Sequence, residues 1–315
     1  MIYNKYSDYL KNTYGEKVYK IPINIPVTCP NRDGCISTGG CIFCGEEGTG
    51  FENLSNDISV KEQLKRNIAH IGEKYASNKY IAYFQNFTNT YLPLEKFKTY
   101  ILESIVENVV EIAISTRPDC ISDDYLIFIK EIGDKYGVKI TIELGLQTVN
   151  YNTLKKINRG HTLAEYLDAV LRIKKYGFKI CTHMILNLPW DDEADVCEAA
   201  KIISSLGIDF VKLHSLYIVK NTAMEEMYKN KEFEMISVDE YKRRVIMFLE
   251  YLSSEVVIQR LISRAPKQNT MFVNWYMSWW KIRDEIELEM KVGGNYQGRL
   301  CDYLGGKALK GMNLL

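Results

Sequence analysis

Short apolar runs alternate along the chain with longer stretches in which apolar residues recur every third or fourth position. The short runs, such as VEIAIS at 110–115, are rich in Ile and Val, which is typical of buried β-strands. The longer stretches, such as DDYLIFIKEIGDKYG at 123–137, have the period of an amphipathic α-helix. We predict strands at 18–25, 80–84, 110–115, 138–146, 178–186, 210–218 and 255–263, and helices at 60–76, 92–109, 123–137 and 163–177, the last two ending at Gly137 and Gly177.

The order of these elements, strand then helix several times over, indicates a parallel sheet covered by helices, either open or closed into a barrel. No Gly/Ser-rich or Pro-rich linker and no internal repeat divides the chain. We therefore predict one α/β core at 1–263, which includes the N-terminal segment, and a C-terminal extension at 264–315 that closes the active site. Functional groups in parallel α/β folds collect at the carboxyl ends of the strands, so we expect functional residues in the segments that follow the predicted strands.

Four of the eight cysteines lie within CPNRDGCISTGGCIFC at 29–44, directly after the first predicted strand. Cys29, Cys41 and Cys44 have the spacing C-x11-C-x2-C, and Cys35 lies inside the long spacer. Four thiolates would suit a structural zinc ion. Three thiolates would hold an iron–sulfur cluster and leave one iron free to bind another group. The spacing alone leaves both possibilities open.

Charge balance and the N-terminus narrow the class of protein. The 315 residues are 46% hydrophobic, and 40 basic and 40 acidic side chains give a formal net charge of zero. Nucleic-acid-binding proteins usually carry a basic excess, so this balance disfavours a large RNA or DNA footprint but allows a local basic patch. The N-terminal MIYNKYSDYLKNTYG has no long apolar run, so we predict a cytoplasmic protein with no membrane partner. Cytosolic thiols are kept reduced, which disfavours a disulfide.

The cysteine motif and seven further stretches together resemble the radical S-adenosylmethionine (SAM) superfamily. Specifically, they resemble its YhcC/YtqA-type family, which is related to the Elongator catalytic subunit. The similarity runs in order from about residue 5 to residue 298. The stretches that carry it are CPNRDG with GGCIFC, YIAYFQNFTNT, STRPDC, IELGLQT, INRGH, HMILNLP, LHSL and NYQG.

This resemblance implies a partial (β/α)6 TIM-like barrel in which Cys29, Cys41 and Cys44 hold a [4Fe-4S] cluster. Cys35 lies outside the family pattern and is interpreted as an incidental thiol. SAM would bind the fourth iron through its amino and carboxylate groups, and an electron from an external donor such as flavodoxin or ferredoxin would release a 5'-deoxyadenosyl radical. The residues that the motifs place around SAM are Gln85, Thr88, Ser115, Arg117, Glu143, which would bind the ribose or amine, and Arg159, which would bind the carboxylate.

The resemblance suggests two substrates for the radical. The family includes queuine lyase, which cleaves the modified base queuine to release its 7-deazaguanine core, and proteins linked to modification of the tRNA wobble position. Zero net charge, the absence of an appended RNA-binding domain and departures from the family's pocket motifs favour queuine. The alternatives are a tRNA wobble-uridine enzyme and, in a different class, a noncatalytic zinc-binding protein. The predicted substrate residues are Asn187, Asp191, Tyr217, Arg264 and Trp275.

Several of these residues also have an ordinary structural interpretation. His183 and His214, the predicted catalytic residues, are either buried core histidines or groups that face the barrel interior and transfer a proton near pH 7. Trp275 precedes Trp279 by one helical turn, so this segment is either a core helix face or an aromatic lid over a planar heterocycle. Asp191 either reads a guanine-like edge or begins a helix.

Overall fold

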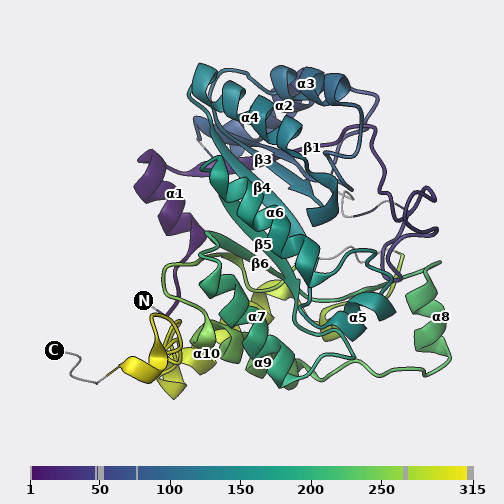
Figure 1. Cartoon of the computed structure of the whole chain (residues 1–315), viewed down its shortest axis with the longest axis vertical. Coiled ribbons are helices and arrows are strands. Elements are labelled where there is room, and N and C mark those ends of the chain that lie inside the picture. Colours follow the sequence, from purple (N-terminus) through teal and green to yellow (C-terminus); the bar gives the residue numbers. More distant parts are fainter. Residues whose placement is uncertain (1, 47, 49–52, 76, 265–268, 311–315) are drawn as a thin grey trace.

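The computed structural model describes residues 2–46, 48, 53–75, 77–264 and 269–310, and its main sheet curls into an open half-barrel (Figure 1). The strands follow the order of the chain and every neighbouring pair is parallel. This confirms the predicted partial barrel of the α/β class. In sheet order, the strands are β1 (Val18–Ile23), β2 (Lys79–Phe84), β3 (Val109–Thr116), β4 (Lys139–Gln147), β5 (Lys179–Ile185), β6 (Phe210–His214) and β8 (Val257–Arg260).

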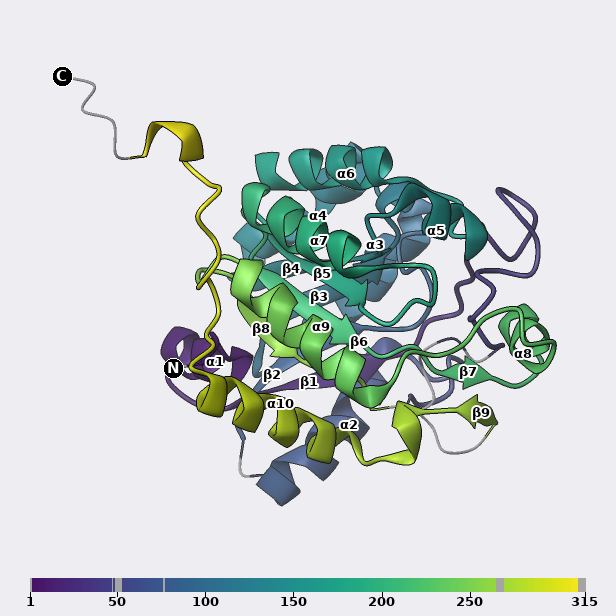
Figure 2. The same ribbon diagram turned by 90° about the horizontal axis from the view of Figure 1, so that it is seen from below.

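Helices cover the outer face of the curled sheet, and Figure 2 shows α3, α4, α6, α7 and α9 arranged around it. None of the helices in the described ranges is long and apolar enough to cross a lipid bilayer. The helices are α1 (Tyr6–Tyr14), α2 (Val60–Tyr75), α3 (Leu94–Glu103), α4 (Asp123–Tyr136), α5 (Tyr151–Lys156), α6 (Leu163–Lys175), α7 (Glu193–Ser205), α8 (Ala223–Lys229), α9 (Val238–Tyr251) and α10 (Trp279–Gly293), with short 3-10 turns at Pro118–Cys120, Asn274–Tyr276 and Lys307–Leu309.

The two faces of the sheet carry different side chains because successive residues of a strand point to opposite sides. On β4, Ile142 and Leu144 pack in the core beneath the helices, whereas Glu143 between them faces the barrel interior. On β3, Ile114 packs in the same core and Ser115 faces inward. The helix-facing side is therefore apolar, and the interior is lined by polar and charged groups.

The predicted strand at 210–218 is in fact two strands. β6 ends at His214, and Ile218–Val219 forms β7, which pairs antiparallel with β9 (Thr270–Phe272) in a separate sheet. The side chain of Asn187 holds the backbone of Leu216, where Oδ1 accepts a hydrogen bond from the Leu216 N–H at 2.7 Å. This side-chain contact takes the place of ladder pairing where the chain leaves the main sheet.

The predicted single helical face through Trp275 and Trp279 is wrong. Trp275 has a left-handed backbone with φ of 50° and lies in a 3-10 turn, and α10 begins only at Trp279. The Trp275 indole donates a hydrogen bond to the Ile236 carbonyl at 2.7 Å and packs against Tyr241 and Phe272. Its role in the structure is to anchor the turn before α10.

The half-barrel has two free edges, β1 and β8, with α1 and α10 beside the space between them. The N-terminal segment runs along the β8 edge, where Asn4 O accepts a hydrogen bond from Ile258 N at 2.8 Å. Gln297, beyond α10, donates from its backbone N–H to Ile2 O at 2.9 Å. The two ends of the described chain therefore brace the same edge of the barrel, and the predicted division near residue 263 stays a prediction.

Candidate active site

The loop that follows β1 carries the cysteine motif and lies at the carboxyl ends of the strands. Cys41 is buried and Cys29 and Cys44 are half-buried, and all three line a cavity of about 220 Å³, which we call the cluster cavity. Cys35 is exposed and is not among the residues that line it. The fold thus brings the three cysteines of the family pattern together and leaves Cys35 outside.

The segment after α5 holds this loop in place. The Asn158 side chain donates to the Gly40 carbonyl at 2.9 Å, and the Asn158 carbonyl accepts a hydrogen bond from the Asn31 side chain. Gly160 has φ of 76°, and a Cβ at this position would collide with the Asn31 side chain. Glycine alone fits this close approach. The NRGH motif therefore shapes the cysteine loop in addition to supplying Arg159.

An arginine side chain lies beside each of the three cysteines. Positive charge near a thiol favours the thiolate, which is the form that binds iron. Burial, with a smaller contribution from the Cys41 and Cys29 thiols, raises the pKa of the Cys44 thiol to about 11, so iron binding has to displace its proton. The pairs are Arg32 Nη1 with Cys44 Sγ at 3.5 Å, Arg117 Nη1 with Cys29 Sγ at 3.8 Å, and Arg159 Nη1 with Cys41 Sγ at 3.6 Å.

Two of these arginines differ in how their charge is compensated. Arg117 forms a two-pronged ion pair with Asp119, at 2.9 Å through Nε and 2.6 Å through Nη2. Arg159 forms no ion pair with the described residues, and its buried Nε has no hydrogen-bond partner among them. A buried guanidinium with an unused donor suits an anionic group. This matches the predicted contact of Arg159 with the SAM carboxylate, which stays a prediction.

The donor set fits the cofactors that the sequence suggests. Three thiols that line one cavity can ligate three irons of a [4Fe-4S] cluster and leave the fourth iron for SAM. When both groups are bound, the cluster supplies the electron that cleaves SAM. Gln85, Thr88 and Ser115 line the same cavity, and Thr88 and Ser115 are buried there, so the fold places them beside the cysteines. Their contacts with SAM stay predictions.

Glu143 is fully buried on the inner face of β4 and is engaged by four cationic or polar neighbours, one of which is the Ser115 hydroxyl at 3.4 Å. Its carboxylate accepts hydrogen bonds from Lys20, from Lys212 at 2.9 Å and from His183 at 2.8 Å. Burial alone would raise its pKa, but Lys20 and Lys212 hold the pKa of this carboxyl well below its usual range. Glu143 is therefore an ionised centre of the barrel interior, and its predicted contact with SAM stays a prediction.

His183 and His214 both line the cluster cavity, with ring centroids 5.1 Å apart. Burial lowers the pKa of His183 to about 4, although the hydrogen bond that its Nε2 donates to Glu143 opposes this effect. Burial and the adjacent Arg260 lower the pKa of His214 well below its usual value. Both imidazoles are therefore neutral at pH 7, and their predicted part in proton transfer stays a prediction.

Two of the five predicted substrate residues line the cluster cavity, namely Tyr217 and Arg264. The other three do not line it, and two of them, Asn187 and Trp275, have structural partners instead. Asn187 holds the backbone of Leu216, and Trp275 anchors the turn before α10. Asp191 lies after β5, where burial raises the pKa of its carboxyl to about 6 and the hydroxyl groups of two nearby threonines partly oppose the rise. Asn187, Asp191 and Trp275 are not among the residues that line this cavity, and their predicted contact with the substrate stays a prediction.

The sequence interpretation missed several residues of the barrel interior. Lys20 and Lys212 interrupt apolar strand sequences. Because side chains alternate between the two faces of a strand, their positions could have indicated that they face the barrel interior. Gln147 has φ of 78° at a bulge between β4 and β5, which turns the end of β4 and which no local pattern announces. The interior residues missed are Lys20, Tyr83, Gln147, Lys212 and Arg260, all of which line one or both of the cavities described here.

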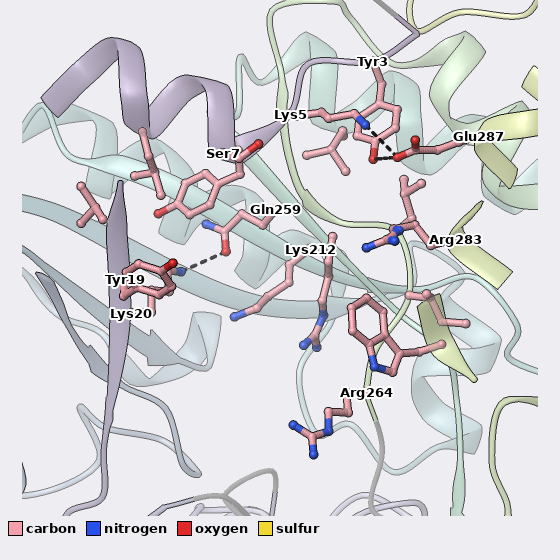
Figure 3. A pocket seen from close by; sticks show the side chains of 18 of the residues that line it. Tyr3, Lys5, Ser7, Tyr19, Lys20, Lys212, Gln259, Arg264, Arg283 and Glu287 are labelled. Carbon is pink, nitrogen blue, oxygen red and sulfur yellow. Dashed lines mark hydrogen bonds and ion pairs between the residues drawn. The ribbon is translucent and has the colours of Figure 1, made fainter. Parts of the chain in front are cut away.

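A second cavity, of about 870 Å³, lies between the free edges of the half-barrel, and we call it the lateral cavity (Figure 3). Side chains of β1, β8, α1 and α10 line it. Figure 3 shows Lys20 and Gln259 meeting across the space, from β1 and β8 respectively. Lys212, Arg260 and Arg264 line both cavities, so the lateral cavity adjoins the cluster cavity.

Models of known protein families match most of the chain. Residues 23–203 match the family model described as the Radical SAM superfamily, and residues 208–292 match the Radical_SAM C-terminal domain. The chain is 34% identical over 306 residues to protein YtqA of Bacillus subtilis (strain 168), which covers 96% of this chain and 94% of YtqA. It is 30% identical over 300 residues to protein YhcC of Escherichia coli (strain K12), which covers 94% of this chain and 96% of YhcC.

More distant matches include tRNA-modifying proteins. The tRNA uridine(34) acetyltransferase of Methanocaldococcus infernus is 28% identical over 156 residues, which cover 46% of this chain and 28% of that protein. The solved structure of Methanocaldococcus infernus Elp3 with an N-terminal deletion superposes with a TM-score of 0.68 at 18% identity. This match covers 89% of this chain and 64% of that chain, less than two thirds of it, and it supports the fold alone.

Proposed function

Since this chain belongs to the radical SAM superfamily, and so uses a [4Fe-4S] cluster and SAM, we propose that it directs a 5'-deoxyadenosyl radical at a nucleobase or a nucleoside. The observation that carries this proposal is the contact between the two cavities at Lys212, Arg260 and Arg264. Small-molecule sites usually measure about 300–1,000 Å³. The lateral cavity falls within that range and adjoins the cavity that the three cysteines line.

Queuine is the first candidate substrate, with cleavage of a carbon–nitrogen bond and release of the 7-deazaguanine core. Support comes from Tyr217 and Arg264, which depart from the family pattern and line the cluster cavity. A free base would be recognised by stacking and a few hydrogen bonds to its edge, and phosphates would play no part. This reaction would make the protein a lyase of queuine salvage.

A uridine at the tRNA wobble position is the second candidate, and two observations favour it. A relative that shares 28% identity over 156 residues is a tRNA uridine(34) acetyltransferase. The lining of the lateral cavity is also strongly basic, since eight of its side chains are cationic and two are carboxylates. This local patch could contact phosphates even though the whole chain has no net charge.

One experiment tests the proposal and separates the candidates. Anaerobically reconstituted protein is incubated with SAM, dithionite and either queuine or bulk tRNA, and the products are followed by mass spectrometry. A 7-deazaguanine product from queuine supports the lyase, and a mass change in a tRNA nucleoside supports the second candidate. If 5'-deoxyadenosine does not increase with either substrate, neither a nucleobase nor a nucleoside is the target.

A matched pair of cysteine variants controls for chemistry unrelated to the cluster. Cys41→Ala removes a thiol that lines the cluster cavity, whereas Cys35→Ala removes an exposed thiol outside it. Product that persists in Cys41→Ala would have to arise without the cluster. Product lost in Cys41→Ala and kept in Cys35→Ala assigns the reaction to the proposed site.

A further inference from the structure

Hydrogen-bond donors from both edges of the barrel gather where the lateral cavity meets the cluster cavity. Lys20 comes from β1, Lys212 from β6, and Gln259 and Arg260 from β8. Lys20 Nζ donates to Gln259 Oε1 at 2.9 Å across the gap, with Lys212 beside this pair (Figure 3). Tyr6 of α1 lines the same cavity. The inner end of the lateral cavity, as we call this region, is therefore rich in donors.

Positive charge exceeds negative charge at the inner end. The Glu143 carboxylate pairs with both Lys20 and Lys212, so one negative charge serves two ammonium groups. Arg260 forms no ion pair with the residues that the structure describes, and its Nη2 instead contacts the His214 ring at 2.6 Å. That ring is neutral, because burial lowers the pKa of His214. The three cations therefore have a single carboxylate as their ion-pair partner.

The next carboxylate toward α1 does not change this balance. Glu111 accepts hydrogen bonds from Tyr14 at 2.6 Å and from Thr141 at 2.7 Å, and within the described part of the chain it forms no ion pair with Lys20, Lys212 or Arg260. Burial raises the pKa of Glu111, which disfavours its ionised form. Its hydrogen-bonding capacity is also directed toward neutral hydroxyl groups.

Two further polar atoms at this end have no partner. The Tyr6 hydroxyl and the Gln259 side-chain nitrogen are buried, and neither forms a hydrogen bond within the described part of the chain. Buried polar groups are rarely left unpaired, because each one lost from water without a replacement costs about 1–3 kcal/mol. A ligand that accepts hydrogen bonds would satisfy both atoms.

We infer an anion-binding subsite at the inner end of the lateral cavity, formed by Lys20, Lys212, Gln259 and Arg260, that takes a carboxylate or phosphate group of the substrate. Acceptor oxygens with negative charge match this set, because a guanidinium and two ammonium groups form their strongest hydrogen bonds with such oxygens. The inference rests on the proposed function only in identifying the anion as part of the substrate. Free queuine carries no acidic group, so an occupied subsite would favour the nucleotide candidate.

The most direct variant is Gln259→Glu, which keeps the size of the side chain. A carboxylate at this position still accepts the hydrogen bond from Lys20, so the bridge between β1 and β8 is preserved. It removes the unpaired donor and adds a negative charge where an anion would bind. Lys17→Gln is the matched control, since it changes the net charge by the same amount at an exposed position of the same cavity.

The test uses the reconstituted holoprotein and titration calorimetry with inorganic phosphate and with acetate. We expect Gln259→Glu to weaken binding of the better anion by about tenfold or more, and Lys17→Gln to weaken it less than about twofold because an exposed charge is screened. Equal weakening in both variants, unchanged binding in Gln259→Glu, or no binding of either anion to the unmodified protein would overturn the subsite.

Comparison of probes identifies the source of the anion. Tighter binding of phosphate than acetate, and of uridine 5'-monophosphate than uridine, indicates a nucleotide phosphate, whereas tighter binding of acetate indicates a substrate carboxylate. If Gln259→Glu fails to assemble its cluster, Arg260→Gln replaces it, with the same expected loss of anion affinity.

Formation of 5'-deoxyadenosine is measured separately. If the protein binds the anion but forms no 5'-deoxyadenosine with either substrate, the subsite stands and the proposed function is rejected. If it forms 5'-deoxyadenosine but binds no anion, the subsite alone is rejected.

Discussion

Glu143 shows how one buried carboxylate organises the interior of the barrel. It lies on the central strand β4 and receives hydrogen bonds from Lys20 of β1 and Lys212 of β6, two strands that are not neighbours in the sheet. The ion pairs therefore span the inner face of the half-barrel. Removing one member of a buried pair leaves the other charges uncompensated, which is more costly than losing an exposed ion pair.

We predict that Glu143→Gln lowers the free energy of unfolding by about 3 kcal/mol at pH 7. The pKa of Glu143 in the folded protein lies well below its value in the unfolded chain, so its stabilising contribution is present above about pH 4.3 and is lost as the pH falls. Urea unfolding at pH 7 and at pH 4 measures this. A difference between variant and unmodified protein that stays the same at both pH values would contradict the ion-pair account.

The cysteines provide a second prediction at the residue scale. Cys29→Ala, Cys41→Ala and Cys44→Ala should each lose iron and acid-labile sulfide, because each thiol lines the cluster cavity beside its own arginine. Cys35→Ala should retain both, since Cys35 is exposed outside the cavity. Iron and sulfide analysis after anaerobic reconstitution decides this. Equal losses in Cys35→Ala would point to a four-cysteine site.

Arg159 provides a third prediction at the residue scale. Arg159→Gln should weaken SAM binding by about tenfold or more, since the buried guanidinium would lose a charge-assisted contact with the SAM carboxylate. The cluster should still assemble. Arg66→Gln, at an exposed ion pair on α2, is the control and should bind SAM normally. Calorimetry with SAM measures the effect, and normal affinity in Arg159→Gln would remove this residue from the SAM site.

Residues differ in how much of their role the sequence could predict. The cysteines and Arg159 belong to short motifs whose order along the chain resembles a family, so their gathering in one cavity could be anticipated. Lys20, Lys212 and Arg260 belong to no such motif, and their importance comes from facing one another across a curled sheet. Asn187 was assigned to the substrate because it departs from a family pattern, and Trp275 because it could form an aromatic lid, yet the side chains of both hold backbone in place. A departure from a pattern carries no information about which way a side chain points.

At the scale of elements, hydrophobic periodicity was sufficient for the strands of the main sheet and for α2, α3, α4 and α6, whereas α7 and α9 were not among the predicted helices. Predicted strands at 80–84 and 178–186 correspond to β2 and β5 within a residue or two. Periodicity failed where tertiary contacts overrule it, as in the apolar run at 210–218, which divides between two sheets. β9 was not predicted, because a strand of three residues has no measurable period.

The division of the apolar run at 210–218 between two sheets gives a fourth prediction. Asn187→Ala should lower the free energy of unfolding by about 1–2 kcal/mol, because the buried N–H of Leu216 would lose its acceptor at 2.7 Å. Asn230→Ala is the control, since Asn230 is exposed directly after α8 with one weak side-chain contact at 3.4 Å. Urea unfolding of both variants measures the difference. Equal stability of Asn187→Ala and Asn230→Ala would show that the Asn187 contact does not hold the chain at this point.

At the scale of the whole molecule, a net charge of zero conceals an uneven distribution. Eight cationic side chains and two carboxylates line the lateral cavity, so the side chains of the rest of the chain carry the compensating acidic excess. This is the local basic patch that the composition left open, and whether it contacts phosphates stays a proposal. Local clustering of charge is a property of the fold, and it could not be read from totals.

Salt dependence tests this distribution as a fifth prediction. If tRNA is the substrate, the basic lateral cavity engages phosphates, and affinity should fall steeply between about 50 and 200 mM salt because bound counterions are released. If a free base is the substrate, its affinity should change little over the same range. Filter binding of tRNA and calorimetry with queuine provide the two measurements. Affinity for tRNA that does not respond to salt would exclude the lateral cavity as its contact surface.

The central claim is that the three cysteines lining the cluster cavity support reductive cleavage of SAM. The most direct measurement is the amount of 5'-deoxyadenosine formed from SAM and dithionite by reconstituted protein, with Cys35→Ala and Cys41→Ala in parallel. The predicted result is product from the unmodified protein and from Cys35→Ala and none from Cys41→Ala. Absence of 5'-deoxyadenosine from fully reconstituted protein, or equal amounts from all three, would contradict the claim.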